Sequence, residues 1–222
     1  RCSIGSLEAR LVHASPSELG AIVPSGLDGG RTPVRVDDVP GETAFVEIGS
    51  VVAKGLHQVD SPVFDRHGTL YVTFSGSRGE RVPVSLFRVQ RDGAREALPA
   101  EILNPTSLAM DPDGRLYVSS RFEGTVYRLR PNGDAEVFAA DLGVPCGLAF
   151  GPDGDLYVGD RSGSILRVTP DRQTRVVATL PSSVAAYHLT FGPDGHVYVT
   201  APTLSSHDAV YRIASDGTVS TV

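Results

Sequence analysis

The sequence predicts an all-β protein whose larger part is a β-propeller of four-stranded blades. Three observations support this prediction: a segment pattern that occurs four times, a spacing of 40 to 46 residues between its copies, and four short strand patterns inside each copy. Units of this length cannot bury a core alone and stack as propeller blades. We therefore assign residues 44–222 to the propeller, with blades at about 57–102, 103–142, 143–181 and 182–222.

Each copy begins with a strand, a turn and a second strand: SPVFDRHGTLYVT from Ser61, SLAMDPDGRLYVS from Ser107, GLAFGPDGDLYVG from Gly147 and HLTFGPDGHVYVT from His188. The first apolar run shows little polar alternation, so we expect it to be buried and to line the central channel. The turn glycine supplies the positive φ that a tight hairpin needs. One tyrosine occupies a fixed place in every second strand, where we expect it to pack between blades: Tyr71, Tyr117, Tyr157 and Tyr198.

Two further strands complete each copy. The third alternates in polarity, as in TVYRLR and SILRV, and a polar turn leads to a more variable fourth strand such as AEVFAADL. Residues 50–56 look like another fourth strand, although the last copy already has its own at residues 218–222. We therefore expect the chain to be a fragment and the whole propeller to have six blades; a closed four-bladed ring is the alternative.

Residues 1–43 lack the blade pattern. Strand-like segments at 7–15, 19–24 and 32–39 are separated by Pro-Ser and Gly-Gly turns. The order AIVPSGLDGGRTPVRV followed by PGETAFVEIG resembles the C-terminal half of an IPT/TIG domain, which is an immunoglobulin-like β-sandwich. Half a sandwich exposes unpaired strand edges, so we expect this part to be poorly ordered. By resemblance, a propeller joined to such a sandwich suggests an exported or cell-surface protein.

Composition argues against several classes of function. The net charge is -6 and the arginines are scattered singly, whereas a nucleic-acid-binding face needs clustered basic residues. No apolar run approaches the roughly 20 residues that cross a bilayer. The two cysteines, Cys2 and Cys146, lie in different predicted domains, and no disulfide framework can be derived from them.

The blade core GLAFGPDGDLYVG and its three counterparts resemble NHL repeats and the wider SMP-30/gluconolactonase-like and strictosidine-synthase-like propellers. The resemblance covers about three quarters of the chain. It concerns the fold more than the activity, because propellers host many different functions.

Ligands of such propellers are expected over the central channel, at the end where the chain enters each first strand and where second and third strands are joined. The residues before the first strands are Asp60, Thr106, Cys146 and Tyr187, followed in the last blade by His188. The loops between second and third strands add further candidates: Arg121, Asp160, Arg161, His207 and Asp208. Together these side chains predict a polar rim that carries both signs of charge.

The resemblance to SMP-30-like hydrolases implies a divalent metal over the channel, held by a Glu and by later Asn and Asp residues. Such a metal polarises the ester carbonyl and activates water. Asp60 falls where that Glu is expected and is our candidate ligand for calcium or zinc. Thr106 and Cys146 stand in the places of the asparagines, and Tyr187 in that of the aspartate. One carboxylate cannot hold a hard cation by itself.

Ordinary structural roles compete with functional ones. Cys146 fits a small buried apolar residue better than a nucleophile, and His188 fits packing as well as a channel position. His207 and Asp208 fit a solvated pair in a surface loop. We therefore expect a non-catalytic propeller that presents its polar face to a protein or a small sugar-like ligand. A metal-dependent sugar-lactone hydrolase, or a related lyase or hydrolase, is the alternative, and a third interpretation assigns the activity to blades outside this chain.

Overall fold

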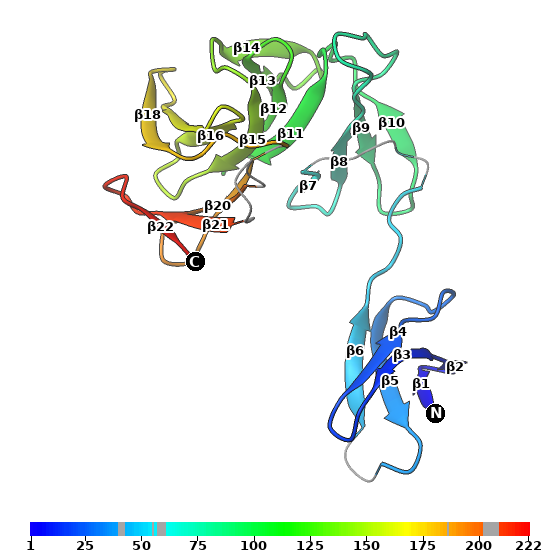
Figure 1. The fold of residues 1–222 in the computed structure, drawn as a ribbon. Helices are drawn as coiled ribbons and strands as arrows, with labels where there is room; N and C mark the ends of the chain where they lie inside the picture. Colours follow the sequence, from blue (N-terminus) through cyan, green and yellow to red (C-terminus); the bar gives the residue numbers. More distant parts are fainter. Residues whose placement is uncertain (40–42, 55, 57–60, 186, 202–208) are drawn as a thin grey trace. The chain divides into compact units, whose positions relative to one another are not determined.

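The computed structural model describes residues 1–39, 43–54, 56, 61–185, 187–201 and 209–222 (Figure 1). Its regular elements in these ranges are all β-strands. None of the residues described belongs to a helix long and apolar enough to cross a membrane. The chain divides into two compact units, Arg1–Lys54 and Gly55–Val222.

The N-terminal unit contains two antiparallel sheets. The first has the order β2-β1-β5-β6 and consists of β1 (Cys2–Ile4), β2 (Leu7–Glu8), β5 (Gly30–Val36) and β6 (Ala44–Ile48). The second pairs β3 (Arg10–Ala14) with β4 (Leu19–Ile22). Cys2, Ile4 and Ala9 form a small buried core. The sheets leave several apolar side chains exposed, among them Leu11, Val12, Leu19 and Ile22.

This unit extends further along the chain than the sequence analysis expected. Strand β6 pairs with β5 along its whole length, so residues 44–48 join the N-terminal sheet and the division falls after Lys54 and not at residue 43. The prediction of a strand at residues 50–56 is wrong for the described residues of this segment, since residues 51–54 and 56 form no strand. The poor order expected of this unit in solution stays a prediction.

The larger unit contains four antiparallel sheets of four strands, which we number as blades 1 to 4 in chain order. Blade 1 consists of β7 (Val63–Phe64), β8 (Leu70–Thr73), β9 (Leu86–Val89) and β10 (Arg95–Ala97). Blade 2 consists of β11 (Pro105–Met110), β12 (Leu116–Ser120), β13 (Thr125–Leu129) and β14 (Ala135–Ala139). Blade 3 consists of β15 (Pro145–Phe150), β16 (Leu156–Asp160), β17 (Ser164–Val168) and β18 (Thr174–Thr179). Blade 4 consists of β19 (His188–Phe191), β20 (Val197–Ala201), β21 (Ala209–Ile213) and β22 (Val219–Thr221).

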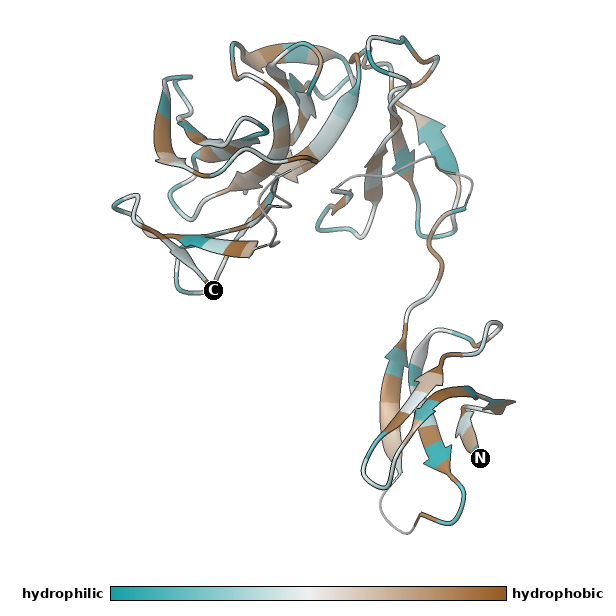
Figure 2. Ribbon diagram, viewed as in Figure 1, coloured by the Kyte–Doolittle hydropathy of each residue, from teal (hydrophilic) through white to brown (hydrophobic). Residues whose placement is uncertain are grey.

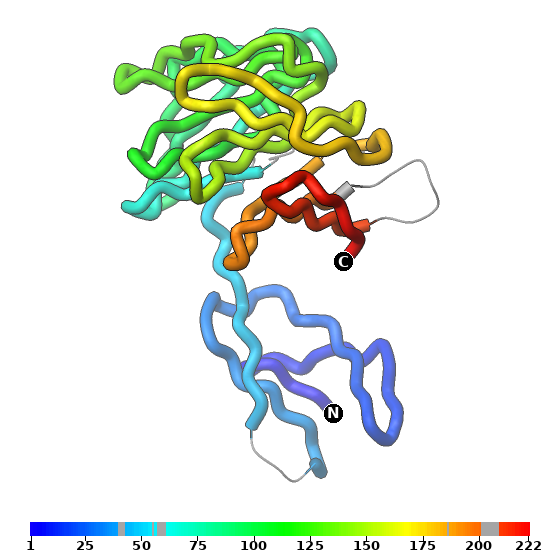
Figure 3. The backbone as a smooth tube through the Cα atoms, turned by 90° about the vertical axis from the view of Figure 1, so that its left-hand side faces the viewer, coloured from blue at the N-terminus to red at the C-terminus, as the bar shows by residue number. Residues whose placement is uncertain are grey.

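Successive blades are stacked through their first strands. Strand β11 lies beside β15, and β15 lies beside β19, while the sheets follow one another around an arc (Figures 1 and 3). The buried clusters combine residues of neighbouring blades, so the core of this unit lies between its sheets. Hydrophilic residues gather at many of the turns that join the strands (Figure 2). This distribution follows from the repeat, because each sheet must bury both of its faces.

The tyrosines of the repeat occupy equivalent positions, which confirms the strand assignment of the four copies. Each is the second residue of the second strand of its blade: Tyr71, Tyr117, Tyr157 and Tyr198. The turn before it contains a glycine at positive φ, such as Gly114 at 84° and Gly154 at 82°. These hairpins therefore form as the turn chemistry predicts.

The first strands differ in burial. Strands β11 and β15 are buried along most of their length, as expected. In blades 1 and 4 the expectation is wrong, since β7 and β19 each contain an exposed residue, Phe64 in the first case. In the described part of the chain, β22 pairs only with β21, and the Val222 N–H donates to the Val210 carbonyl at 2.9 Å.

Candidate functional site

The loops between second and third strands lie at one end of the blades, which we call the mouth face. They comprise residues 74–85 in blade 1, 121–124 in blade 2 and 161–163 in blade 3. Backbone bonds join two of these loops to the segment that leads into the first strand of the same blade: Arg121 N–H donates to Asn104 O (3.3 Å) and Arg161 N–H donates to Val144 O (3.0 Å). The two groups of candidate residues from the sequence analysis therefore meet on this face.

Three of the residues expected before the first strands are buried: Thr106, Cys146 and Tyr187. The Thr106 hydroxyl donates to the Asn104 carbonyl at 3.3 Å, and the Tyr187 hydroxyl donates to the Pro181 carbonyl. Burial raises the pKa of Tyr187 to about 12, so this phenol is neutral at pH 7. All three side chains contribute to packing beneath the mouth face. Asp60, His207 and Asp208 lie outside the described residues.

Buried polar side chains form a second layer under this face. The Ser107 N–H donates to Ser119 Oγ (3.0 Å), and Ser107 Oγ in turn accepts from the Leu148 N–H of blade 3 (3.2 Å). The Asp160 carboxylate is buried and accepts from the Val144 N–H (2.7 Å) and from Ser162. Buried polar groups are tolerated when they are hydrogen-bonded in this way, and such networks fix one geometry.

Most residues of this buried polar layer were not predicted from the sequence, although the repeat contains a pattern that indicates them. The fourth residue of the second strand is polar in three of the four copies, in the segments LYVT, LYVS and VYVT. A polar residue at one place in an otherwise apolar, buried strand indicates a hydrogen-bonding role. Ser119 accepts a backbone hydrogen bond there, and Thr73 and Thr200 donate to the carbonyls of Thr106 and His188, both at 3.4 Å.

Asn104 fixes the longest of the described mouth-face loops. Its side chain is 1% exposed, its φ is +45°, and its Oδ1 accepts from the Gly79 N–H at 2.6 Å. Its Nδ2 donates to the carbonyls of Gly76 (3.0 Å) and Ser77 (2.9 Å) and to Ser75 Oγ (3.2 Å). Asn is among the few residues that tolerate this backbone region. Its amide contacts four loop groups, and three of them share the two N–H donors of Nδ2.

The exposed rim above this layer carries charge and one aromatic ring. Arg121 and Glu123 flank Phe122, which is 48% exposed. The ring lies against Gly79, where a Cβ would approach Phe122 Cε2 to 3.1 Å. Glu123 accepts a hydrogen bond from the Tyr127 hydroxyl at 3.0 Å. These contacts hold Phe122 and Glu123 in place on the surface.

Two other predicted residues also belong to this rim. The Arg161 guanidinium is anchored by the carbonyls of Ser183 (3.4 Å) and Val184 (3.2 Å). His188 Nδ1 lies 3.1 Å from Ser61 Oγ, a contact that joins blade 4 to the segment leading into blade 1. The structure thus brings His188 to the first blade and holds Arg161 beside the buried Asp160.

The donor set of the described residues does not fit calcium or zinc. Within the described ranges, no three His, Cys, Asp or Glu side chains gather where they could share an ion. Thr106 and Cys146, which lie in the first strands and not before them as predicted, and Tyr187, which precedes β19, offer a hydroxyl, a thiol and a phenol, all buried. Calcium needs six to eight oxygen ligands, and a protein zinc site usually needs at least three nitrogen, sulfur or carboxylate ligands.

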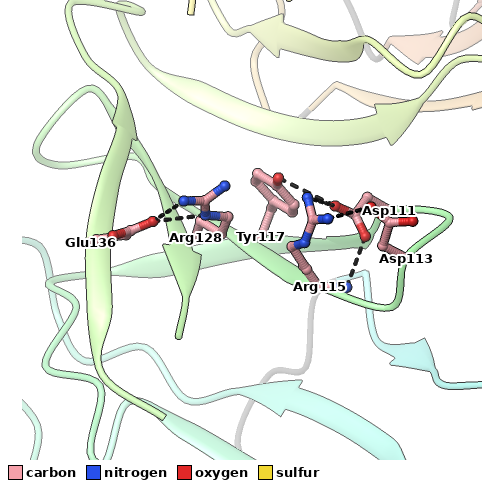
Figure 4. Close-up of polar contacts among 6 residues, drawn as sticks. All are labelled: Asp111, Asp113, Arg115, Tyr117, Arg128 and Glu136. Carbon is pink, nitrogen blue, oxygen red and sulfur yellow. Dashed lines mark hydrogen bonds and ion pairs between the residues drawn. The ribbon is translucent and has the colours of Figure 1, made fainter. Parts of the chain in front are cut away.

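The opposite end of the blades, which we call the hairpin face, carries a polar network that Figure 4 shows for blade 2. The Tyr117 hydroxyl donates to Asp111 Oδ2 (3.3 Å), Arg115 pairs with the same carboxylate (3.4 Å), and Arg128 pairs with Glu136. Every tyrosine of the repeat faces an arginine across the sheet: Tyr71 and Arg88, Tyr117 and Arg128, Tyr157 and Arg167, Tyr198 and Arg212. In the sequence, this arginine occurs at the same place in every third strand, in the segments SLFRV, TVYRL, SILRV and AVYRI.

Comparisons with known proteins support the same architecture. A family described as strictosidine synthase-like, N-terminal, matches residues 144–168, which contain the first three strands of blade 3. Virginiamycin B lyase from Staphylococcus aureus is similar with a TM-score of 0.58 and 19% identity, over 73% of this chain and 54% of that chain. The larger unit therefore has a β-propeller fold, to which the four blades described above belong.

Two further solved structures are similar to this propeller chain. A gluconolactonase from Xanthomonas campestris has a TM-score of 0.54 and 20% identity, over 77% of this chain and 62% of that chain. An auxiliary nutrient binding protein from Bacteroides thetaiotaomicron has a TM-score of 0.58 and 13% identity, over 99% of this chain and 63% of that chain. The chain thus spans about half to two thirds of the length of these three structures. No curated protein matches it by sequence.

Proposed function

We propose that the propeller is a non-catalytic binding module that presents its mouth face to a small sugar-like ligand. The observation that carries this proposal is the division of the face into two layers. Thr106, Cys146 and Tyr187 are buried in packing, while Arg121, Phe122 and Arg161 are positioned on the rim above them. A rigid lower layer under exposed polar and aromatic groups suits binding, because such a face loses little conformational entropy when a ligand binds.

The rim has the chemistry that a sugar requires. A sugar ring offers apolar C–H groups on one side and hydroxyl groups at its edge. Phe122 supplies an apolar, fixed ring for the first, and its neighbours Arg121 and Glu123 supply hydrogen-bond donors and acceptors for the second. Pockets for small molecules combine aromatic contact with a few polar groups in this way.

The proposal extends to the whole protein. The similarity to an auxiliary nutrient binding protein over 99% of this chain supports a binding role for a propeller joined to a small β-rich unit. In this proposal the complete propeller has six blades. The N-terminal unit is an IPT/TIG-like module that acts as a spacer or adhesion element.

A metal-dependent sugar-lactone hydrolase is the second candidate. It is favoured by the similarity to a gluconolactonase and by the sequence position of Asp60, which is the proposed calcium or zinc ligand of that alternative. Under this hypothesis the further ligands come from outside the described residues. A lactone would then be opened by a metal-activated water.

A paired experiment separates the two candidates. The protein is titrated by calorimetry with a panel of monosaccharides and sugar acids, and its hydrolysis of glucono-lactone is measured with added calcium or zinc. We expect saturable sugar binding that falls at least about tenfold in Phe122→Ala, a loss of about 1.4 kcal/mol. Phe64→Ala is the matched control, because Phe64 is similarly exposed (54% against 48%) but lies next to a hairpin turn of blade 1.

The hydrolase alternative predicts a different outcome. Metal-dependent lactone hydrolysis that disappears in Asp60→Ala would replace the binding proposal with an enzymatic one. Binding of no sugar in the panel by the wild-type protein would also overturn it and would direct the search to protein partners of the same face.

A further inference from the structure

Each pair of neighbouring blades forms a groove at the hairpin face, and the repeat supplies three equivalent positions in it. These are the tyrosine of the second strand, the residue two places after the one that pairs with the arginine of the third strand, and the last residue of the next blade's first strand. In the groove between blades 2 and 3 they are Tyr117, Phe138 and Phe150. Their rings pack edge to face, with centroids of Phe138 and Phe150 at 5.0 and 4.9 Å from that of Tyr117. Aromatic side chains therefore fill this groove.

The groove between blades 1 and 2 has smaller side chains at two of these positions. Glu96 pairs with Arg88 as Glu136 pairs with Arg128, which aligns Leu98 with Phe138. The three positions are therefore occupied by Tyr71, Leu98 and Met110. A cleft of about 690 Å³ opens here, and its apolar lining includes these three residues with Leu116 and Leu129.

The groove between blades 3 and 4 is an intermediate case. It retains one of the two phenylalanines, Phe191, whose ring centroid lies 4.9 Å from that of Tyr157, while Val177 takes the place of Phe138. Its cavity is about 250 Å³. The cavity is thus larger between blades 1 and 2, where both phenylalanines are replaced, than between blades 3 and 4, where one of them is replaced.

The cleft between blades 1 and 2 also presents guanidinium groups, of which Arg88 is paired with Glu96 and Arg115 with Asp111 and Asp113. Four arginines line it together with two glutamates: Arg88, Arg115, Arg128, Arg130, Glu96 and Glu136. Arg128 and Arg130 share the single carboxylate of Glu136, with Arg130 Nε at 3.0 Å from Oε2, so this wall has one positive charge in excess. A guanidinium has five N–H donors, and its planar geometry suits a carboxylate. The N–H donors of Arg128 and Arg130 that Glu136 does not occupy can therefore bind an anionic group of a ligand.

We infer that the cleft between blades 1 and 2 binds a small aromatic carboxylate. The aromatic ring of the ligand occupies the space that Phe138 and Phe150 fill in the next groove and packs against Tyr71. The carboxylate of the ligand accepts hydrogen bonds from Arg130 and Arg128. A volume near 690 Å³ lies within the range of small-molecule sites. This site is on the hairpin face and is independent of the function proposed for the mouth face.

The protein contains its own reporter for this test. Met110 is the single methionine of the 222 residues and lines the cleft. Protein labelled with methyl-¹³C methionine is titrated with 2-naphthoate and, as the uncharged match, 2-naphthamide. We expect 2-naphthoate to shift the Met110 methyl signal to saturation and 2-naphthamide to bind at least about fivefold more weakly. Met110→Leu identifies the signal and separates it from any initiator methionine.

Two variants that place a phenylalanine in a groove test whether the probe binds between blades 1 and 2. Leu98→Phe installs the side chain found at the equivalent place in blade 2, and we expect it to weaken 2-naphthoate binding at least about tenfold. Val177→Phe makes the equivalent change in the groove between blades 3 and 4 and should leave binding unchanged. Thermal unfolding checks that both variants fold, and Arg130→Gln should weaken 2-naphthoate binding without filling the cleft.

Several results would overturn the inference. One is a Met110 signal that does not respond to millimolar 2-naphthoate in the wild-type protein. Another is equal weakening by Leu98→Phe and Val177→Phe, which would place the probe elsewhere. Equal binding of the naphthoate and the naphthamide would remove the role of the arginines. If Leu98→Phe does not fold, the wild-type titration and Arg130→Gln decide the question alone.

Discussion

The junction between blades 1 and 2 and the junction between blades 2 and 3 share one strand pattern but are built differently. Blades 2 and 3 are joined at the hairpin face by a packed trio of aromatic rings, Tyr117, Phe138 and Phe150. Blades 1 and 2 leave a charged cleft there, and blade 1 carries a longer loop at the mouth face that is held by Asn104. The repeat therefore determines the backbone of each junction. Two or three side chains decide whether the junction is packed as part of the core or leaves an open cleft.

The largest expected effect is the loss of a ring from the closed junction. Phe138 is 5% exposed, so Phe138→Ala removes buried contacts and leaves a cavity, which should cost about 3–5 kcal/mol. Leu98→Ala at the equivalent place beside the open cleft should cost less than about 2 kcal/mol, because part of the side chain already faces solvent. Urea denaturation of both variants measures the difference. Equal losses would mean that the two junctions are packed alike.

A second prediction concerns the loop of blade 1. Asn104→Ala removes the hydrogen bonds that this buried side chain makes to partly buried and exposed groups of residues 75–79, which should cost about 1–3 kcal/mol in total. Loosening of the loop should also expose Arg78 and Arg81 to trypsin. Asn132→Ala, in an exposed turn of blade 2, is the matched control and should change neither quantity by more than about 0.5 kcal/mol or twofold. Unchanged cleavage in Asn104→Ala would show that the loop is held by other contacts.

The sequence predicted the blades well because their information is local. Hairpin glycines and strand tyrosines recur within a few residues of each other, so a single copy already determines its turn and strand. The sequence did not predict that Thr106 and Tyr187 are buried, since their exposure depends on the neighbouring blade. The sequence also did not predict that Leu98 stands where blade 2 has the aromatic Phe138. This equivalence is recognised only when the strand register of both blades is known. Asp60 stays an untested prediction.

The smallest expected effect is the pH dependence of the cleft's ion pairs. Hydrogen bonds from Arg128 and then from Arg130 lower the pKa of Glu136 in the folded protein. A carboxyl group with a lowered folded pKa binds its proton more readily in the unfolded chain. It therefore contributes stability above its unfolded pKa of about 4.3, and this stability is lost as the pH falls through the lower folded pKa.

Glu136→Gln should therefore be less stable than the wild-type protein at pH 7, by a small amount because the ion pairs are partly exposed. The difference should shrink below pH 4.3 and disappear once the pH lies below the folded pKa of Glu136. Melting temperatures from pH 7 to pH 3 measure it, with Glu101→Gln as the control, because Glu101 pairs with one arginine and is 85% exposed. A constant difference across this range would show that Glu136 stabilises blade 2 by packing and not by its charge. In that case the ion pairs with Glu136 would contribute little to holding Arg128 and Arg130 in their positions in the cleft.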